Sequence, residues 1–346
     1  MKAWVLHDIG DIRFEDVDKP KIKDNEVLVA VKAAGICGSD IPRIYETGAH
    51  NMPIIPGHEF SGQVVEIGAS VDNKWLDKRV GIFPLIPCGK CELCKKQLFE
   101  MCRNYNYLGS RCNGGFAEYC AVPEWNLIEL PDNVTYEQAA MLEPMSVAVH
   151  AIRRAAPKKD DRVIVHGLGT IGLLIIMFLK DMGVENILAI GNKDFQKSVS
   201  TKIGVKEDNF CNSKTDNVPE FIRRQTLNGA DVYFECVGRN ETISTAVDNT
   251  APAGKVLLVG NPYSDISFEK NVYWKILRNQ ITVTGTWNST FTHDDDDDWS
   301  YVIERLENSH FDPSLIISKI CSLCELSNFL DDLYVKNKPN IKIIAK

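Results

Sequence analysis

The pattern of apolar and polar residues divides the chain into two regions of different character. Residues 26–36, EVLVAVKAAGI, form a strand-like run, and another follows His58 in EFSGQVVEIG. Farther along, Val163–His166 is typical of a buried strand and precedes a glycine-rich loop, an apolar helix and a second strand at Ile187–Ile190. Further strand candidates are ADVYFECVG, GKVLLVGNP and QITVTGTW, with helical segments between the earlier ones. Alternating strands and helices predict an α/β fold with a parallel, doubly wound sheet.

Length, composition and net charge limit the classes of protein to which this chain can belong. The 346 residues, 44% hydrophobic and 25% charged, suffice for two domains of ~150 residues each. The chain begins MKAWVLHDIG, and no window approaches the ~18 apolar residues of a membrane span, so we expect a cytoplasmic protein without a membrane partner. A net charge of −8 argues against nucleic acid as a partner. The run Asp294–Asp298 is expected to be a solvated loop.

A glycine-rich segment follows the first buried strand and predicts a dinucleotide site. Between a strand and a helix, G-x-G-x-x-G lets backbone approach a pyrophosphate at the helix N-terminus, although the glycines could also serve a tight turn alone. The segment comprises Gly167, Leu168, Gly169, Thr170, Ile171 and Gly172.

The second strand lacks the acid that usually binds the adenosine ribose. Its end reads Gly191, Asn192 and Lys193, with Asp194 a little late. The missing carboxylate removes repulsion toward a 2′-phosphate, and Lys193 could attract it. The sequence therefore favours NADP over NAD, and the alternative is that NAD binds without this acid.

Four cysteines with the spacing C-x2-C-x2-C-x7-C predict a closed metal site. Cys88, Cys91, Cys94 and Cys102 lie in a segment that is typical of an irregular loop. Four thiolates would hold zinc tetrahedrally and leave no open position, so the zinc would be structural. The alternatives are an iron–sulfur cluster, free thiols, or a zinc ribbon for nucleic acid, which the acidic charge opposes.

A second set of ligand candidates predicts a catalytic metal. Cys37 and His58 lie 21 residues apart at the ends of probable strands, and Glu59 and Glu143 supply carboxylates. One sulfur, one imidazole and one carboxylate leave a zinc position open for substrate. Neighbouring strand residues point to opposite faces, which favours Glu143 as the ligand and leaves Glu59 behind it or exchanging into the site.

The motifs GICGSD, PGHEFSG, the four-cysteine segment, GGFAEY, LEP and GLGTIG occur in this order along the whole chain. The chain thereby resembles the zinc-dependent medium-chain alcohol and polyol dehydrogenases, and CGSDIPRI, GAH, GSR and GGFAEY look most like members of the galactitol 1-phosphate type. The resemblance implies a GroES-like β-rich catalytic domain with an inserted Rossmann domain, two zinc ions, catalytic zinc at Cys37, His58 and a glutamate, and a homodimer or homotetramer. The implied ranges are 1–150 with a zinc lobe at about 85–105, 151–287, and 288–346 returning to the first domain.

The resemblance also suggests roles around the substrate. Ser39 would bond the substrate oxygen and take its proton, unless it only caps a turn. Pro42 stands where many relatives have a relay histidine, so the route could include His50. Arg43 would bind a substrate phosphate or form a surface salt bridge, and Arg111 is a second phosphate candidate.

Trp287 could line the pocket or belong to the core. Three functions remain: a polyol-phosphate dehydrogenase, a dehydrogenase of an unphosphorylated polyol or diol of the sorbitol, threonine or butanediol type, or a non-catalytic redox sensor that binds zinc and nucleotide.

Overall fold

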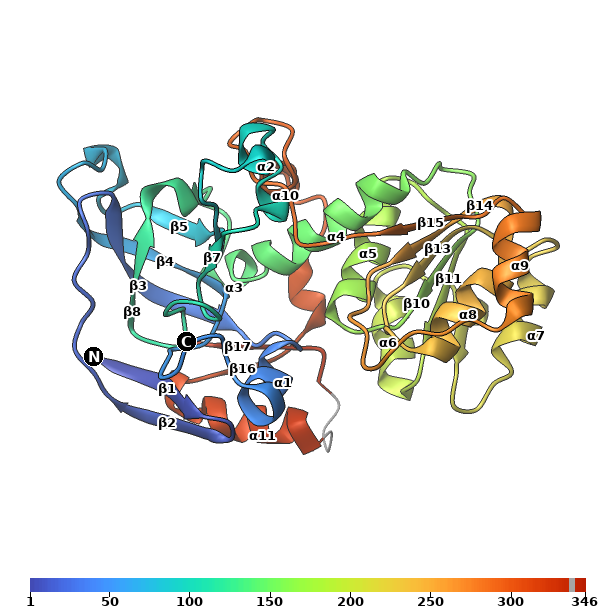
Figure 1. The fold of residues 1–346 in the computed structure, drawn as a ribbon, viewed down its shortest axis with the longest axis horizontal. Helices are drawn as coiled ribbons and strands as arrows, with labels where there is room; N and C mark the ends of the chain where they lie inside the picture. The colour runs from blue at the N-terminus through green and yellow to red at the C-terminus, as the bar shows by residue number, and fades with distance from the viewer. Residues whose placement is uncertain (336–339) are drawn as a thin grey trace. The chain divides into compact units, whose positions relative to one another are not determined.

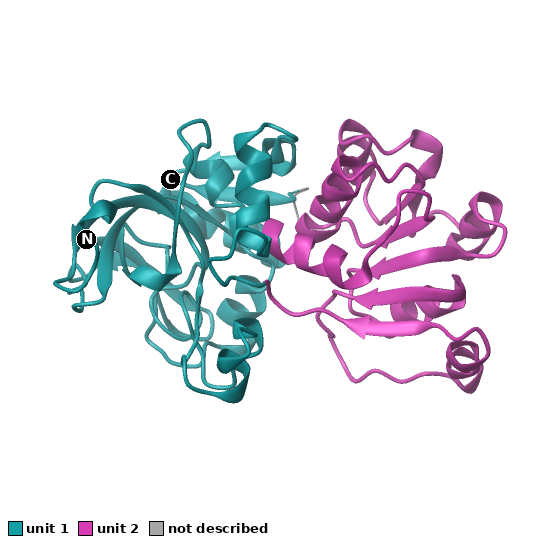
Figure 2. Ribbon diagram, turned by 90° about the horizontal axis from the view of Figure 1, so that it is seen from above, with its two compact units in different colours: residues 1–144, 290–346 teal, residues 145–289 magenta. Residues whose placement is uncertain are grey.

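The chain folds into two compact units, seen in a computed structural model that describes residues 1–335 and 340–346. The first unit comprises residues 1–144 and 290–346, and the second comprises residues 145–289 (Figure 2). The sequence-based boundaries were 150/151 and 287/288, whereas the structure divides at 144/145 and 289/290. The second unit is thus an insertion in the first.

The first unit is rich in β-strands, as the resemblance implied, and its described strand pairs are antiparallel except for the parallel pair β16–β17. In its described residues one sheet has the order β16-β17-β3-β4-β5-β9. β8 lies outside this order and also pairs with β3. Two small ladders, β1–β2 and β6–β7, complete it (Figure 1). The strands are β1 (Lys2–Asp8), β2 (Asp11–Asp16), β3 (Glu26–Gly35), β4 (Glu59–Ile67), β5 (Arg79–Ile82), β6 (Leu85–Ile86), β7 (Asn106–Tyr107), β8 (Tyr119–Pro123), β9 (Leu127–Glu129), β16 (Ile317–Cys321) and β17 (Lys342–Ala345).

Helices of the first unit are short, and strand residues supply most of its core. Val29, Phe60 and Phe116 are among the buried side chains that pack together there. The helices are α1 (Asp40–Pro42), α2 (Glu92–Lys95), α3 (Tyr136–Ala139), α10 (Asp298–Glu307) and α11 (Leu326–Val335), and α4 (Leu142–Ala155) begins in this unit and continues into the second.

The second unit, described throughout residues 145–289, is a six-stranded parallel sheet with helices on both faces (Figure 1). Its order, β12-β11-β10-β13-β14-β15, corresponds to 3-2-1-4-5-6, the doubly wound order of dinucleotide-binding folds. The predicted fold class is confirmed. The elements are β10 (Val163–His166), α5 (Thr170–Asp181), β11 (Ile187–Gly191), α6 (Asp194–Lys202), β12 (Phe210–Asn212), α7 (Val218–Gln225), β13 (Ala230–Glu235), α8 (Asn240–Asp248), β14 (Thr250–Leu258), α9 (Lys270–Arg278) and β15 (Thr282–Gly285).

The acidic run differs from its prediction as a solvated loop. Asp297 and Asp298 are only 3% and 1% exposed. Asp297 is the N-cap of α10 and accepts hydrogen bonds from the backbone N–H groups of Thr292, His293 and Ser300. The N–H of Ser300 in the first turn of α10, together with two N–H groups of the preceding loop, compensates the burial of this carboxylate. The solvated-loop prediction was therefore wrong for the last two aspartates.

No helix within the described part of the chain combines the length and the apolar character that crossing a membrane requires.

Candidate active site and cofactor loop

Three metal-ligand candidates meet where β3 ends and β4 begins. The two strands are antiparallel, with Gly35 opposite Glu59, so Cys37 after β3 lies beside the start of β4. One ligand atom each of Cys37, His58 and Glu59 falls within 4.8 Å of the other two. His58 precedes the strand and follows Gly57, whose φ is +92°. The rule of opposite faces therefore does not separate His58 from Glu59, because the backbone is irregular there.

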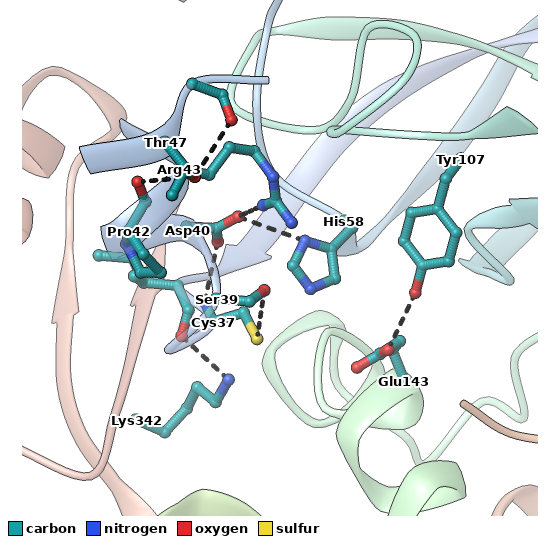
Figure 3. Close-up of polar contacts among 12 residues, drawn as sticks. Cys37, Ser39, Asp40, Pro42, Arg43, Thr47, His58, Tyr107, Glu143 and Lys342 are labelled. Atoms are coloured by element: carbon teal, nitrogen blue, oxygen red, sulfur yellow. Dashed lines mark hydrogen bonds and ion pairs between the residues drawn. The ribbon is translucent and has the colours of Figure 1, made fainter. Parts of the chain in front are cut away.

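Behind His58 lies Asp40, a carboxylate with no exposed surface (Figure 3). Asp40 accepts hydrogen bonds from the backbone N–H of Cys37 at 3.0 Å and from Arg43 Nη1 at 2.5 Å. His58 Nδ1 lies 3.4 Å from Asp40 Oδ1, within ion-pair distance, and has no hydrogen-bond partner among the described residues. Burial acts to raise the pKa of Asp40, but the charges of His58 and Arg43 hold it below its ordinary value.

Glu59 is also paired. Lys342 Nζ, from β17, bonds the Glu59 carboxylate and the backbone oxygen of Ile36, and both charged side chains are 1% exposed. Burial acts to lower the pKa of Lys342, and the Glu59 carboxylate raises it overall. The group around Cys37 therefore includes a lysine whose charge balances one carboxylate.

Glu143 lies in the first turn of α4 and accepts a hydrogen bond from the Tyr107 hydroxyl at 3.2 Å (Figure 3). The Tyr107 ring packs edge-on against the His58 ring at 5.8 Å. Burial raises the pKa of Glu143 to about 7, and the charge of Glu59 adds to this rise. Glu143 thus faces the same group, although the cluster of mutually close ligand atoms includes Glu59 and not Glu143.

The residues that were predicted to bind substrate differ in their burial and in their contacts. Ser39 Oγ donates to Cys37 Sγ at 3.3 Å, so it lies beside the metal candidates. Arg43 does not form a surface salt bridge. Its side chain is only 18% exposed, and it pairs with the buried carboxylate of Asp40. His50 is exposed, and the Arg111 guanidinium stacks 4.3 Å from the Tyr105 ring centre. Trp287 belongs to the second unit and is 57% exposed, which excludes the alternative of a core tryptophan.

The four-cysteine segment brings its sulfurs together as the spacing predicts. The Cys91–Cys94, Cys88–Cys94 and Cys91–Cys102 sulfur pairs are 3.5, 3.9 and 3.9 Å apart. Tetrahedral zinc with bonds of ~2.3 Å requires ~3.8 Å between sulfurs. The Cys94 backbone N–H lowers the pKa of Cys91 to about 6, which favours the thiolate that binds metal. The four side chains therefore fit a closed zinc site.

The glycine loop has the form that a dinucleotide requires. Gly167 has φ +102°, a left-handed conformation suited to glycine. A Cβ on Gly172 would lie 2.0 Å from Gly167 O, so this glycine allows helix α5 to pack on the loop. A Cβ on Gly169 would meet no atom within 4 Å, which leaves space for a pyrophosphate close to the backbone.

Asn192 and Lys193 follow β11, where the ribose acid is missing. The Gln196 side-chain oxygen accepts from both of their backbone N–H groups, and its amide donates to Leu168 O at 2.9 Å. Gln196 therefore ties the end of β11 to the glycine loop. Asp194 begins α6 and accepts a hydrogen bond from Asn212 at 2.9 Å.

Sequence reasoning did not identify Asp40, Tyr107 or Lys342 as members of the site. Asp40 could have been found, because it stands three residues after Cys37 in CGSD. Tyr107 and Lys342 carry no local signal, since their partners lie 36 and 283 residues away in the chain.

Comparison with known proteins agrees with this geometry. The model of the alcohol dehydrogenase GroES-like domain matches residues 23–132, and that of the zinc-binding dehydrogenases matches residues 170–308. Galactitol 1-phosphate 5-dehydrogenase of Escherichia coli is 34% identical over 289 residues, 83% of each chain. Sorbitol dehydrogenase of Bacillus subtilis is 30% identical over 300 residues, 85% of this chain and 84% of the relative.

The fold is shared with a solved structure of one of these relatives. Galactitol-1-phosphate dehydrogenase from Escherichia coli superposes with a TM-score of 0.91 at 31% identity, covering 100% of this chain and 99% of the other. This chain therefore shares the fold of a known dehydrogenase. Within that fold it has the cluster of cysteine, histidine and carboxylate, the four-cysteine segment and the glycine loop. The chain belongs to the zinc-binding alcohol and polyol dehydrogenases and is an oxidoreductase.

Proposed function

We propose that this enzyme oxidises a secondary hydroxyl of a sugar alcohol phosphate similar to galactitol 1-phosphate, giving a ketose phosphate, with hydride transfer to NAD or NADP. The observation that carries the proposal is the convergence of Cys37, His58 and Glu59, with Glu143 facing them, in a chain 34% identical to a galactitol 1-phosphate 5-dehydrogenase.

Two zinc ions are proposed, one at Cys88, Cys91, Cys94 and Cys102 and one at Cys37, His58 and a glutamate. The first would be structural, since four sulfurs fill a tetrahedral site. At the second, zinc supplies Lewis acidity, which lowers the pKa of a bound hydroxyl. Both Glu59 and Glu143 remain candidates for the carboxylate ligand; Glu59 is nearer, but Lys342 already pairs with it.

The protein's own groups then handle orientation and the proton. Ser39 Oγ lies 3.3 Å from Cys37 Sγ, so it can accept the proton of a hydroxyl held beside that sulfur. Pro42 has no side-chain group to pass it on, so the route from Ser39 leads elsewhere, with His50 a candidate. Asp40 keeps the His58 imidazole oriented toward the site.

Arg43 is the proposed phosphate contact. Its Nη1 is occupied by Asp40, and the guanidinium has further N–H groups for phosphate oxygens. Arg111 is a second candidate.

A substrate panel with purified protein tests this function. Galactitol 1-phosphate and other hexitol phosphates, free polyols and amino-alcohols would each be assayed with NAD and NADP, with and without a chelator. We expect metal-dependent turnover that is highest with a hexitol phosphate. Highest kcat/KM for a free polyol would contradict the phosphate assignment.

Arg43→Ala with Asp40→Asn as matched control separates the two roles of Arg43. If Arg43 binds phosphate, Arg43→Ala raises KM for the phosphorylated substrate far more than for the free polyol. Asp40→Asn removes the carboxylate partner of both Arg43 and His58 but keeps the Arg43 guanidinium, so its effect through the metal group should be similar for both substrates. Equal effects of Arg43→Ala on both would remove the phosphate role.

The second candidate function is the same oxidation of an unphosphorylated polyol or diol. Two observations favour it: the 30% identity to a sorbitol dehydrogenase, and the engagement of Arg43 with Asp40, which gives this arginine a task without phosphate.

NADP is the proposed cofactor in preference to NAD. No carboxylate precedes Lys193 at the end of β11, and Asp194 is engaged by Asn212. Titrating the protein with NADH and NADPH and following nucleotide fluorescence would compare the affinities, and tighter binding of NADH would contradict the preference.

A homodimer or homotetramer is also proposed. In the second unit β15 is a terminal strand, Val283 on it is 36% exposed, and neighbouring α9 exposes Tyr273 and Leu277. Unpaired edge strands readily pair with another chain. Light scattering would give the mass, and a monomer at micromolar concentration would contradict this assembly.

A further inference from the structure

A single π-helical turn lies six residues after the candidate metal ligand Cys37 and carries one of the proposed substrate contacts. The turn, η1 (Arg43–Thr47), comes directly after α1 and begins with Arg43. π-Helical turns are rare and are frequently found at functional sites. Within η1, Ile44 has no exposed surface, and its backbone oxygen accepts a hydrogen bond from the N–H of Gly10 at 2.7 Å. This part of the turn is therefore anchored in the core of the first unit.

The next residue, Tyr45, joins η1 to helix α11. Its hydroxyl donates a hydrogen bond to Asp331 Oδ1 at 2.6 Å. Its ring stacks on the Tyr334 ring, with 4.5 Å between the ring centres and 14° between their planes. Asp331 and Tyr334 are neighbours on one face of α11, because they are three residues apart. Burial and the Asp331 carboxylate raise the pKa of Tyr45, so its hydroxyl keeps the proton that it donates.

Helix α11 is a fixed support for Tyr45. Leu326 and Leu330 on this helix have no exposed surface and belong to the core of the first unit. Just before the helix, the backbone oxygen of Leu323 accepts a hydrogen bond from Trp4 Nε1 at 2.6 Å. Because α11 is held by the core and by β1, it can hold the turn that Tyr45 belongs to.

Arg43, at the start of η1, has a single hydrogen-bond partner among the described residues. Its Nη1 donates to Asp40 Oδ1 at 2.5 Å (Figure 3). One hydrogen bond lets the planar guanidinium turn about the bonded atoms, so the direction of its remaining N–H groups depends on where η1 holds the Arg43 backbone. The position of η1 therefore decides which substrate oxygens these N–H groups can reach.

We propose that Tyr45, anchored to α11 by Asp331 and Tyr334, is a positioning residue that keeps η1 where the remaining N–H groups of Arg43 meet the substrate phosphate. The proposal rests on the proposed polyol-phosphate substrate. It predicts that loosening the anchor weakens recognition of the phosphorylated substrate and leaves the chemistry at the metal group unchanged. Helix α11 thus contributes to substrate specificity through η1.

Two variants loosen the anchor while keeping the fold. Tyr45→Phe removes the hydroxyl and retains the stacked ring, and Asp331→Ala removes the acceptor at an exposed helix position where alanine is favoured. Each should raise KM for galactitol 1-phosphate about fivefold, the effect of losing one hydrogen bond. The kcat, and the KM for free galactitol, should stay within about twofold of the wild-type values. Asp331→Asn keeps an acceptor oxygen and should recover most of the affinity.

The matched control is Tyr334→Phe, which removes a hydroxyl from the same aromatic pair but keeps the ring on which Tyr45 stacks. It should have the wild-type KM for both substrates. An unchanged KM in Tyr45→Phe and Asp331→Ala, or an equal rise for galactitol 1-phosphate and galactitol, would overturn the proposal, because Tyr45 would then only support the fold.

The double variant Arg43→Ala/Tyr45→Phe shows whether the effect passes through Arg43. If it does, Tyr45→Phe adds nothing once the guanidinium is gone, and the double variant has the KM of Arg43→Ala to within about twofold. Additive effects of the two substitutions would overturn the proposal and leave the proposed function standing. If Arg43→Ala itself does not raise KM selectively for galactitol 1-phosphate, the proposed phosphate contact fails and the role of Tyr45 fails with it, so the two failures are distinguishable.

Discussion

At the scale of single residues, the candidate metal group depends on side chains that are not ligands themselves. Asp40 is the clearest example of such a side chain. Its buried carboxylate accepts hydrogen bonds from the backbone N–H of Cys37 and from the guanidinium of Arg43, and it lies within ion-pair distance of the His58 imidazole. Groups that orient metal ligands commonly change metal affinity when they are altered.

Asp40→Asn should therefore weaken zinc binding at this group by about 10–100-fold. The amide removes the negative charge that balances Arg43 and orients His58. Competition with a chromophoric chelator measures the zinc affinity. Asp16→Asn, at an exposed carboxylate paired with Lys2, is the control and should leave the affinity unchanged. Unaltered zinc affinity in Asp40→Asn would show that Asp40 does not support the ligands.

His166 gives a prediction for pH. Burial lowers the pKa of its imidazole to about 4, from ~6.5 in an unfolded chain. Between these values the unfolded chain binds a proton that the folded chain does not, so the free energy of unfolding rises with pH across this window. Acidification from pH 7 to pH 4 should cost up to about 3 kcal/mol from this residue.

Glutamine at position 166 can still bond the Tyr233 hydroxyl, which lies 2.9 Å from His166 Nδ1, but it does not titrate. Urea unfolding of His166→Gln at a series of pH values should show a flatter dependence than the wild-type protein. His50→Gln, at an exposed position, should keep the wild-type slope. Equal slopes in all three proteins would contradict the assignment to His166.

At this scale the sequence predicted some side chains of the site and missed others for a physical reason. The four cysteines have a recognisable spacing, because one short loop sets their geometry locally. Cys37 and His58 were predicted from their positions at strand ends and from the motifs around them, and they meet through the pairing of β3 with β4. Lys342 meets Glu59 only because β17 pairs with β3 near Gly35, a tertiary contact with no local pattern.

At the scale of elements, β17 has a role beyond completing a sheet, since it carries Lys342 into the metal group. Lys342→Met leaves the Glu59 carboxylate buried without its cation, which should destabilise the metal-free protein by about 3–5 kcal/mol. Zinc should recover part of this loss, because the ion places positive charge near Glu59. Denaturant unfolding with zinc and with a chelator measures both values.

Two controls accompany Lys342→Met. Glu59→Gln combined with Lys342→Met removes both charges and should be less destabilised than Lys342→Met alone. Lys346→Met breaks a pair between an exposed lysine and half-buried Glu137 and should cost about 1 kcal/mol, less than the loss of the fully buried pair. A loss in Lys342→Met that zinc does not reduce would argue against metal beside Glu59.

The four-cysteine segment is an element without regular structure of its own apart from α2 and a short turn at Phe99–Met101. The Phe99 ring contacts Trp125 at 5.1 Å, so the segment has one aromatic anchor besides its sulfurs. Cys94→Ser should remove about one zinc equivalent per chain and speed amide exchange in residues 88–102. The reason is that a structural zinc supplies the stabilisation that a hydrophobic core gives to larger segments.

Zinc content by atomic absorption and hydrogen exchange by mass spectrometry would measure these two effects. Cys120→Ser, at a buried cysteine outside the group, should retain the zinc. Unchanged zinc content in Cys94→Ser would show that these sulfurs bind no metal.

Continuous apolar runs predicted strands with nearly the observed bounds, whereas short segments without a clear apolar pattern were not recognised as strands. The apolar run Val163–His166 is β10 with the same bounds, and Ile187–Ile190 lies within β11. β12 has three residues and no visible alternation, so only its pairing with β11 defines it. The acidic run was misread because capping of α10 depends on where that helix starts.

At the scale of the whole molecule, order along the sequence and order in space differ. The first unit is made of two segments, 1–144 and 290–346, whereas the second is one uninterrupted segment. Alternating strands and helices make the inserted unit recognisable from sequence. The return of the C-terminal segment to the first unit was inferred from resemblance, because antiparallel pairing between β17 and β3 leaves no trace in either strand alone.

The uninterrupted segment should fold by itself. Residues 145–289 contain all six strands of their sheet and a core that includes Ile164, Tyr233 and Val256, each without exposed surface. A length of about 145 residues is typical of an independent domain. The isolated segment should therefore unfold in one cooperative thermal transition and bind ADP-ribose within about threefold of the full chain, since glycine loop and strand ends lie within it. Circular dichroism and calorimetry measure the two properties, with the full chain as reference. A segment that melts without a cooperative transition would show that this core depends on the first unit, and the inserted unit would then be a part of one domain and not a domain of its own.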